Sequence, residues 1–302
     1  MKIALTGATG FVGSTLVDLA LERGHEVRAL TRRDQPEREG VAWVRGDLAN
    51  TDALALLCEG ADAVVHVAGV VNAPDKAGFV AGNVTGTKAV VEAAGASGAA
   101  RLVHVSSLSA REPMLSDYGK SKFGAEVAVE QSSLACTIVR PPAIYGPRDT
   151  EMFELFKTAK WGVVPLPPEG RASMIHVSDL AALLLALATD GGEHAGQVYE
   201  PDDGREGGWR HAEMARAIGD AVGRRVIPLS MPAALVKGAA RVDRLLRGAK
   251  AKLTPDRASY MVHPDWVIDA AKRPPAGLWQ PRIETREGLK ATAAWYRAEG
   301  WL

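Results

Sequence analysis

Short apolar runs alternate with segments of helical spacing along the first half of the chain. The runs lie at Ile3–Leu5, Glu26–Leu30, Ala42–Val44, Ala63–Val67, Leu102–Val105 and Thr137–Val139, and the helical segments between them at 12–23, 51–58, 83–96 and 118–130. The runs are rich in valine and nearly continuous, which is typical of strands covered on both faces. The alternation predicts an α/β fold, a doubly wound parallel sheet with helices on both faces.

Prolines change this pattern after residue 140 and predict short elements joined by turns, because proline breaks helices and central strands. One exception is the apolar run Met174–Val177, which Ser178, Asp179 and an apolar helix follow as if it were one more strand of the sheet. We therefore expect a sheet domain made of residues 1–146 and 172–198. A smaller, discontinuous region should comprise residues 147–171 and 199–302.

Composition and charge exclude several classes of protein. Lysine plus arginine (36) equals aspartate plus glutamate (36) over 302 residues, so no net field favours nucleic acid. Two distant cysteines predict neither a disulfide framework nor a metal site. With no apolar stretch of about 18 residues and no leader pattern, we expect a cytoplasmic protein without stable membrane insertion. The basic and apolar stretch Leu235–Leu246 is interpreted as a solvated helix face, not a membrane-surface element.

A glycine-rich turn follows the first predicted strand and opens the first predicted helix. Its sequence, Thr6 to Gly13, has the spacing Gly-x-x-Gly-x-x-Gly. Glycines here permit a tight turn and a close approach of the backbone to a pyrophosphate, which the helix N-terminus attracts. The sequence predicts a dinucleotide site formed by Gly7, Thr9, Gly10, Phe11, Val12 and Gly13.

The end of the second predicted strand concerns the adenosine half of such a cofactor. An acidic residue at this place would bind the ribose 2′-hydroxyl of NAD. The sequence instead has Arg32 and Arg33, with no carboxylate before Asp34. Two guanidinium groups suit a 2′-phosphate, so NADP is favoured over NAD.

Candidate catalytic residues follow the run Leu102–Val105. Ser107 lies just beyond this predicted strand, and Tyr118 and Lys122 are spaced to share one face of the next helix. A tyrosine with a pKa near ~10 is a poor base at neutral pH, but a nearby ammonium stabilises its phenolate. Tyr118 is therefore the expected acid or base and Ser107 the donor to the substrate oxygen, with Ser106 as an open alternative to Ser107.

Eight ordered motifs together resemble the extended short-chain dehydrogenases/reductases, the group often labelled NAD-dependent epimerase/dehydratase. The motifs are Thr6–Gly13, Gly46–Leu48, His66–Gly69, Asn83–Thr87, Ser106-Ser107, Tyr118–Lys122, Arg140–Pro147 and Ile175–Asp179. The resemblance implies a Rossmann-type sheet that binds the dinucleotide and a C-terminal region that binds a small-molecule substrate. It also implies that Asp47 and Leu48 contact the adenine and that Ala68 and Gly69 line the cofactor channel. Asn83 would organise the site, Lys122 would bond the nicotinamide ribose, and Pro141 to Ile144 would pass beside the carboxamide. Homodimers are common in this family, so a homodimer is expected as an option.

Two departures from the sugar-nucleotide epimerases of this family concern the substrate. The link of residues 108–117 is shorter than in many of them. Those enzymes often carry Arg-Asp before the Ile-His-Val segment, where this chain has Ala172 and Ser173, with Arg171 one position earlier. Three functions stay open: a reductase or dehydrogenase of a ketone/alcohol pair, an epimerase or dehydratase that retains its cofactor, and a non-catalytic dinucleotide sensor. The intact Ser107, Tyr118 and Lys122 argue against the sensor.

Overall fold

Seven parallel strands form the central sheet in a computed structural model that describes residues 1–248, 251 and 253–302. Their order is β11-β6-β5-β4-β1-β2-β3, and every neighbouring pair is parallel. The strands are β1 (Lys2–Thr6), β2 (Glu26–Thr31), β3 (Val41–Arg45), β4 (Ala63–His66), β5 (Leu102–Val105), β6 (Cys136–Val139) and β11 (Val198–Tyr199). The predicted doubly wound sheet is confirmed. Its strand order reverses between β1 and β4, the point at which such sheets bind ligands.

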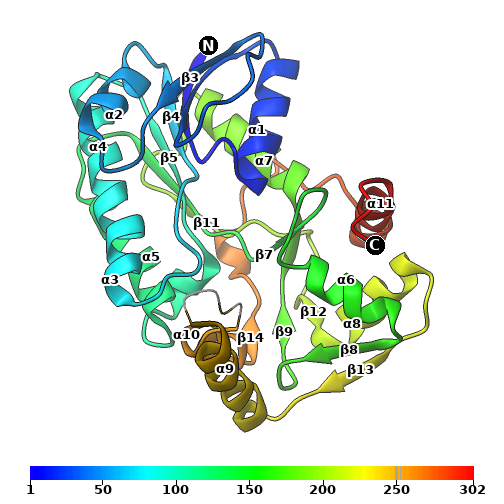
Figure 1. Cartoon of the computed structure of the whole chain (residues 1–302). Coiled ribbons are helices and arrows are strands. Elements are labelled where there is room, and N and C mark those ends of the chain that lie inside the picture. The colour runs from blue at the N-terminus through cyan, green and yellow to red at the C-terminus, as the bar shows by residue number, and fades with distance from the viewer. Residues whose placement is uncertain (249–250, 252) are drawn as a thin grey trace. The chain divides into compact units, whose positions relative to one another are not determined.

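Helices lie on both sides of this sheet. Figure 1 shows α2 (Thr51–Cys58), α4 (Gly86–Ala96) and α5 (Asp117–Glu130) on one side, and α1 (Phe11–Glu22) and α7 (Val177–Thr189) on the other. Side-chain caps fix where some of them begin: the Asn50 side chain accepts a hydrogen bond from Ala53 N ahead of α2, and Ser116 does the same from Gly119 N ahead of α5. Three short elements complete this part: α3 (Lys76–Phe79), the π-helix η1 (Val80–Thr85) and the 3₁₀ turn η2 (Leu108–Arg111).

The chain divides into two compact units. The first, which contains the seven-stranded sheet, comprises Met1–Arg140, Leu180–Glu200 and Pro274–Trp279. The second comprises Pro141–Asp179, Pro201–Arg273 and Gln280–Leu302. Residues 141–146 and 172–179, which the sequence places with the sheet domain, lie in the second unit. The assignment of the two regions to cofactor and substrate stays a prediction.

Within its described residues, the second unit contains three small sheets and six helical elements. The sheets pair β7 (Ala143–Tyr145) with β10 (Met174–His176), β8 (Val163–Leu166) with β13 (Ile227–Ser230), and β9 (Arg171–Ala172) with both β12 (Trp209–Arg210) and β14 (Asp265–Trp266). The helices are α6 (Phe153–Lys160), α8 (His211–Val222), α9 (Ala233–Arg247), α10 (Pro255–Met261), the 3₁₀ turn η4 (Ala270–Lys272) and α11 (Thr285–Ala298). Phe156, Ile218, Leu289 and Tyr296 are fully buried in its core.

The strand predicted from the run Met174–Val177 exists as β10, but it does not extend the seven-stranded sheet. It pairs in parallel with β7, and together they form a separate two-stranded sheet. The prediction was wrong because Pro141 and Pro142 follow β6 and separate it from β7, and β7 then offers β10 a partner of its own. The seventh strand of the main sheet is β11, which runs beside β6. Among the described residues, no helix is long and apolar enough to cross a membrane.

Candidate active site

The glycine turn after β1 allows no side chain at its first and last glycines. Gly7 has a φ of +77°, and a Cβ there would lie 2.7 Å from the backbone nitrogen of Ala68. A Cβ at Gly13 would lie 2.1 Å from the carbonyl oxygen of Gly7. The turn closes with a 3.0 Å hydrogen bond from Gly10 N to Gly7 O. Glycine is therefore required for the chain to fold back tightly onto the end of β4.

The N-terminus of α1 is open at this turn. Gly10 occupies the capping position without a side-chain hydrogen bond, and the first turn of α1 contains no acidic residue. Thr9 and Gly10 are exposed, Phe11 is half-buried and Val12 is buried. Uncapped backbone N–H groups at a helix start attract an anion. The turn thus fits a pyrophosphate, while Val12 packs inward as a core residue.

A buried polar column holds the turn to the sheet. The Thr6 hydroxyl lies 2.6 Å from Nδ1 of His66, whose Nε2 lies 3.0 Å from the Thr87 hydroxyl. Ala68 N donates to the same Thr6 oxygen at 3.2 Å. Burial lowers the pKa of His66 to about 3, with a smaller contribution from the Lys122 charge. This neutral histidine is a structural bridge between β1, β4 and α4.

The predicted adenosine residues follow β2 on an exposed turn. Thr31 closes the turn by donating to Arg33 O at 2.7 Å and accepting from Arg33 N. Arg32 and Arg33 are both exposed. The next carboxylate, that of Asp34, pairs with the Arg45 side chain. The Asp34 carboxylate thus has a cation as its partner, and the two arginines are exposed.

Asp47 and Leu48 follow β3 and differ in burial. Asp47 is exposed, and its Oδ1 accepts a hydrogen bond from Ala49 N at 2.9 Å within its own loop. Leu48 is half-buried and lies against α4, where a Cβ at Gly86 would come within 2.7 Å of its Cδ1. Their predicted contact with an adenine stays a prediction.

Lys122 is the buried cation of the site. It is 4 % exposed, and its Nζ donates to Val105 O, the last carbonyl of β5, at 2.9 Å. Burial lowers the pKa of its ammonium to about 8, against an opposing effect of the Glu126 charge. A Cβ at Gly69 would lie 3.6 Å from this Nζ, so the glycine after β4 leaves room beside it. Lys122 is thereby held at the carboxyl edge of the sheet, in a poorly solvated place where its charge acts strongly.

Asn83 lies in the π-helix η1 and organises the backbone around Lys122. Its Oδ1 accepts from Val70 N at 2.7 Å, and its Nδ2 donates to Val70 O at 2.9 Å. The same Nδ2 also donates to Ser121 Oγ at 2.8 Å, and Ser121 in turn donates to Tyr118 O at 2.7 Å. Asn83 therefore ties the segment after β4 to the first turn of α5. π-helical turns are frequent at functional sites.

The two serines after β5 differ in what they contact. Ser106 is buried and donates to Oε1 of Glu126 at 2.5 Å. Ser107 is half-buried, and its Oγ accepts from Ser109 N at 3.2 Å as the cap of η2. The Ser107 hydroxyl still has its proton to donate, whereas that of Ser106 is used by the Glu126 carboxylate. This difference favours Ser107 as the donor to a substrate.

Tyr118 is half-buried on the first turn of α5, four residues before Lys122. Its ring centroid lies 6.1 Å from that of Phe79. The turn η2 packs tightly beside it, because a Cβ at Gly119 would lie 2.7 Å from Ser109 O. The 3₁₀ turn after Ser107 and the start of α5 are thus fixed against each other.

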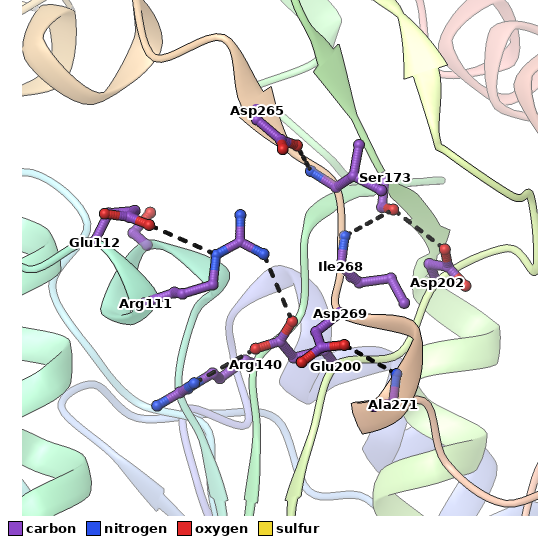
Figure 2. A network of polar contacts seen from close by, with 12 residues as sticks. Arg111, Glu112, Arg140, Ser173, Glu200, Asp202, Asp265, Ile268, Asp269 and Ala271 are labelled. Atoms are coloured by element: carbon purple, nitrogen blue, oxygen red, sulfur yellow. Dashed lines mark hydrogen bonds and ion pairs between the residues drawn. The ribbon is translucent and has the colours of Figure 1, made fainter.

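A buried ion network that the sequence did not single out lies beneath these residues. Arg140 makes a bidentate pair with Glu126, from Nε at 2.8 Å and from Nη2 at 2.6 Å, and its Nη1 lies 3.4 Å from Glu200. Both carboxylates are almost fully buried. Arg111 of η2 lies 3.9 Å from Glu200 and from Glu112, as Figure 2 shows for this part of the network. The Glu126 hydrogen bond raises the pKa of the Arg140 guanidinium further.

Two members of this network carried a signal in the sequence, since Arg140 opens the motif Arg140–Pro147. Glu126 follows Lys122 by four residues and so shares its helix face. Arg140 and Glu200 come directly after β6 and β11, neighbours in the sheet, but only the structure reveals that pairing.

The second unit holds the remaining predicted residues. Pro141 is buried and Ile144 lies in β7, opposite Ile175 of β10. Arg171 is exposed and donates to Gly207 O at 3.0 Å. Ser173 is buried, donates to Asp202 at 3.1 Å and accepts from Ile268 N at 3.3 Å (Figure 2). Ser173 thus closes a contact within the unit, at a place where sugar-nucleotide enzymes of the resembling family often carry a charged residue.

His104 of β5 is fully buried, and neither ring nitrogen has a hydrogen-bond partner. Its ring lies 5.3 Å from that of His66. The other predicted core histidines do have partners, since His176 Nδ1 accepts from Ser178 N at 3.2 Å. Within the described part of the chain, no cluster of three or more histidine, cysteine, aspartate or glutamate side chains could hold a metal ion.

We expect His104→Leu to weaken the acid sensitivity of the fold. Burial holds the pKa of His104 well below 6.5, so below that pH the unfolded chain binds a proton that the folded chain does not. The free energy of unfolding then falls with decreasing pH, by about 1.4 kcal/mol per pH unit for this group. His104→Leu removes that loss and two unpaired nitrogens, so its unfolding free energy at pH 7.5 should match or exceed that of the unchanged chain. Denaturant unfolding at pH 7.5 and pH 5 measures both values.

Val105→Ala, at a buried residue of the same strand, is the control. It should lower the free energy of unfolding by the same amount at both pH values. If the free energy of unfolding changes with pH equally in His104→Leu and in the unchanged chain, the lowered pKa of His104 does not cause the acid sensitivity.

Comparisons with known proteins identify relatives of this chain. A family described as NAD(P)H-binding matches residues 7–191. The chain is 40 % identical to a ceramide reductase of Caulobacter vibrioides, over 99 % of this chain and 96 % of that protein. It is 31 % identical to a 2-alkyl-3-oxoalkanoate reductase of Stenotrophomonas maltophilia, over 97 % and 99 %. The solved structure of the human epimerase family protein SDR39U1 with NADPH superposes with a TM-score of 0.76 at 21 % identity, over 97 % and 99 % of the two chains.

Proposed function

The chain belongs to the NAD(P)-binding extended short-chain dehydrogenases/reductases, and on that premise we propose that it is an NADP-dependent reductase of a ketone on an aliphatic chain. Among its relatives are reductases, dehydrogenases and epimerases, so the chain is an NAD(P)-dependent enzyme of this family. The observation that carries the finer proposal is the buried ammonium of Lys122. Its Nζ donates to Val105 O at the end of β5, two residues before Ser107, and Lys122 lies one helical turn after Tyr118.

In the proposed reaction, the glycine turn would hold NADPH, which would supply a hydride for the carbonyl carbon of the substrate. The Ser107 hydroxyl donates a hydrogen bond to the ketone oxygen and polarises it. Tyr118 gives its phenolic proton to that oxygen, which becomes the alcohol, and solvent later returns a proton to the phenolate. The Lys122 ammonium stabilises this phenolate, and its poor solvation makes the stabilisation stronger than in water. Asn83 keeps the first turn of α5 in register.

The residues of the glycine turn fit the dinucleotide. Gly7 and Gly13 let the turn fold closely onto the main chain of the protein itself, and the uncapped start of α1 offers N–H groups to the diphosphate. The preference for NADP rests on Arg32 and Arg33, since both are exposed and Asp34 is paired with Arg45.

The Arg32→Ser/Arg33→Ser variant should lose its preference for NADPH. We expect its Kd for NADPH to rise about 30- to 100-fold, as two charge-assisted contacts are lost. Its Kd for NADH should change less than about threefold, because NADH lacks the phosphate. Fluorescence titration with both cofactors measures the ratio of the Kd for NADPH to the Kd for NADH.

Arg23→Ser, at an exposed arginine beyond α1, is the matched control and should leave both constants unchanged. An unchanged ratio in the double variant would overturn the NADP proposal.

The proposed substrate class is inferred from the names of relatives and from the contacts of Arg171 and Ser173 in the second unit. Two reductases similar along nearly the whole chain are named for a ceramide and for a 2-alkyl-3-oxoalkanoate, both of which carry alkyl chains. An epimerase acting on a sugar nucleotide is the alternative. It is less favoured because Arg171 is turned to Gly207 and Ser173 is occupied by Asp202.

A turnover assay separates the two proposals. One portion of the purified protein is denatured, and its supernatant is analysed for retained cofactor. A second, native portion is given NADPH with a long-chain β-keto acid, or a sugar nucleotide. The reductase proposal expects little retained cofactor and NADPH oxidation with the keto acid. Retained NAD with sugar-nucleotide turnover, and no NADPH oxidation, would replace the reductase by the epimerase.

A further inference from the structure

Helix α9 has two apolar sides, and the described residues of the chain cover only one of them. Val236 and Ala240 are buried and pack with Ala258 of α10. Leu235, Val242, Leu245 and Leu246 are 62, 56, 84 and 78 % exposed. At 100° per residue these four side chains fall within one sector of the helix, away from the packed side. The sequence predicted a solvated helix face here, and a solvated face normally carries polar side chains instead.

Positive charge lies beside this apolar stripe. Helix α9 contains Lys237, Arg241, Arg244 and Arg247 and a single acid, Asp243, which gives it a net charge of +3 in a chain with no net charge. Asp243 pairs with Arg247 at 3.2 Å. Lys237 and Arg241 are exposed. The helix therefore concentrates cations next to exposed leucines, in contrast to the balanced charge of the whole chain.

We propose that α9 docks on an anionic lipid surface, with its leucine stripe in the boundary between headgroups and acyl chains. Amphipathic helices with leucines on one face and lysine or arginine on the other bind membranes in this way. Lys237 and Arg241 contact the lipid phosphates, since an anionic leaflet attracts basic side chains close to it. At 15 residues α9 is about 22 Å long, too short to span a bilayer, so it lies in the interface plane.

The net positive charge of helix α9 favours an anionic lipid surface over a second copy of the chain as the binding partner. A two-fold symmetric contact through the same face would place one +3 helix against another and desolvate both sets of cations. Exposed leucines would also contribute nothing to binding nucleic acid phosphates. An anionic bilayer complements both the charge and the apolar stripe.

Vesicle sedimentation tests the proposal with the whole purified chain. We expect it to bind vesicles of phosphatidylglycerol and phosphatidylcholine at least about tenfold more strongly than phosphatidylcholine alone, and to be released by salt. Lys237→Gln/Arg241→Gln should lower the partition coefficient about 30-fold. Leu245→Gln/Leu246→Gln should lower it at least about tenfold.

Two matched controls should bind like the unchanged chain. Arg216→Gln/Arg225→Gln removes two exposed cations elsewhere in the second unit, and Leu56→Gln removes an exposed leucine of α2. Equal melting temperatures and NADPH affinities show that each variant is folded. The proposal is overturned if the unchanged chain does not bind the anionic vesicles, or if the α9 variants bind as well as the controls. It is also overturned if the leucine variant turns a dimer into a monomer in light scattering without altering vesicle binding, since a second copy then covers α9.

Discussion

A Tyr118→Phe enzyme should lose turnover by about 10²- to 10⁴-fold, the usual contribution of a positioned proton donor or acceptor. The ring and its packing 6.1 Å from Phe79 remain, and only the phenolic proton is removed. The Kd for NADPH should stay within about threefold, because Lys122 and the glycine turn are untouched. Steady-state kinetics with the keto acid, together with a cofactor titration, give both quantities.

Tyr199→Phe provides a matched loss of one tyrosine hydroxyl in the same unit. That hydroxyl lies 2.7 Å from His194 Nδ1, outside the proposed site, so turnover should be unchanged. If Tyr118→Phe keeps full turnover while the protein stays folded, Tyr118 is not the proton donor. If it instead loses cofactor affinity as much as turnover, its part is structural.

The first unit was predictable because its signals are local. Each strand from β1 to β6 is an apolar run in the sequence, and the glycine turn carries its spacing in eight consecutive residues. Helix α5 was expected one residue short of its observed start at Asp117, where Ser116 caps it. The alternation of strands and helices predicted a doubly wound parallel sheet, but it predicted neither the order of the strands nor β11.

Pairing between distant segments was not predictable. The run Met174–Val177 looks like any buried strand, and nothing local shows that it joins β7 instead of the main sheet. The same holds for Arg140 and Glu200, whose contact depends on β11 running beside β6. His104 is a further case, because only its surroundings in three dimensions reveal a buried ring with no partner.

The glycine turn and the ion network limit the site in different ways. The glycine turn excludes side chains at Gly7 and Gly13, because a Cβ at either position would collide with main-chain atoms. The network instead fixes side chains: Glu126 orients Ser106 directly before Ser107, and shares a helix face with Lys122. Because Glu126 acts on the site through its contacts with Ser106 and Arg140 and its charge near Lys122, we regard it as a positioning residue.

Of the changes considered, removing Arg140 from this network should lower the stability of the protein most. Arg140→Met leaves the carboxylates of Glu126 and Glu200 buried without their main partner. Breaking a buried pair in this way costs about 3–5 kcal/mol, because an uncompensated charge stays in a poorly solvated place. Denaturant unfolding at pH 7.5 should show that loss, and turnover should fall as well because Ser106 and Ser107 lose their anchor.

Arg38→Met is the matched control for Arg140→Met. Arg38 pairs with Asp18 at 2.8 Å, but both side chains are more than 40 % exposed, so its loss should change the unfolding free energy by no more than about 1 kcal/mol. If the free energy of unfolding falls equally in both variants, burial does not make the Arg140 ion pair more stabilising than the exposed Arg38 pair. A stable Arg140→Met protein with normal turnover would show that the network does not position the serines. The expected difference between the two arginines therefore tests whether the charges beneath the site hold its geometry, independently of which substrate it binds.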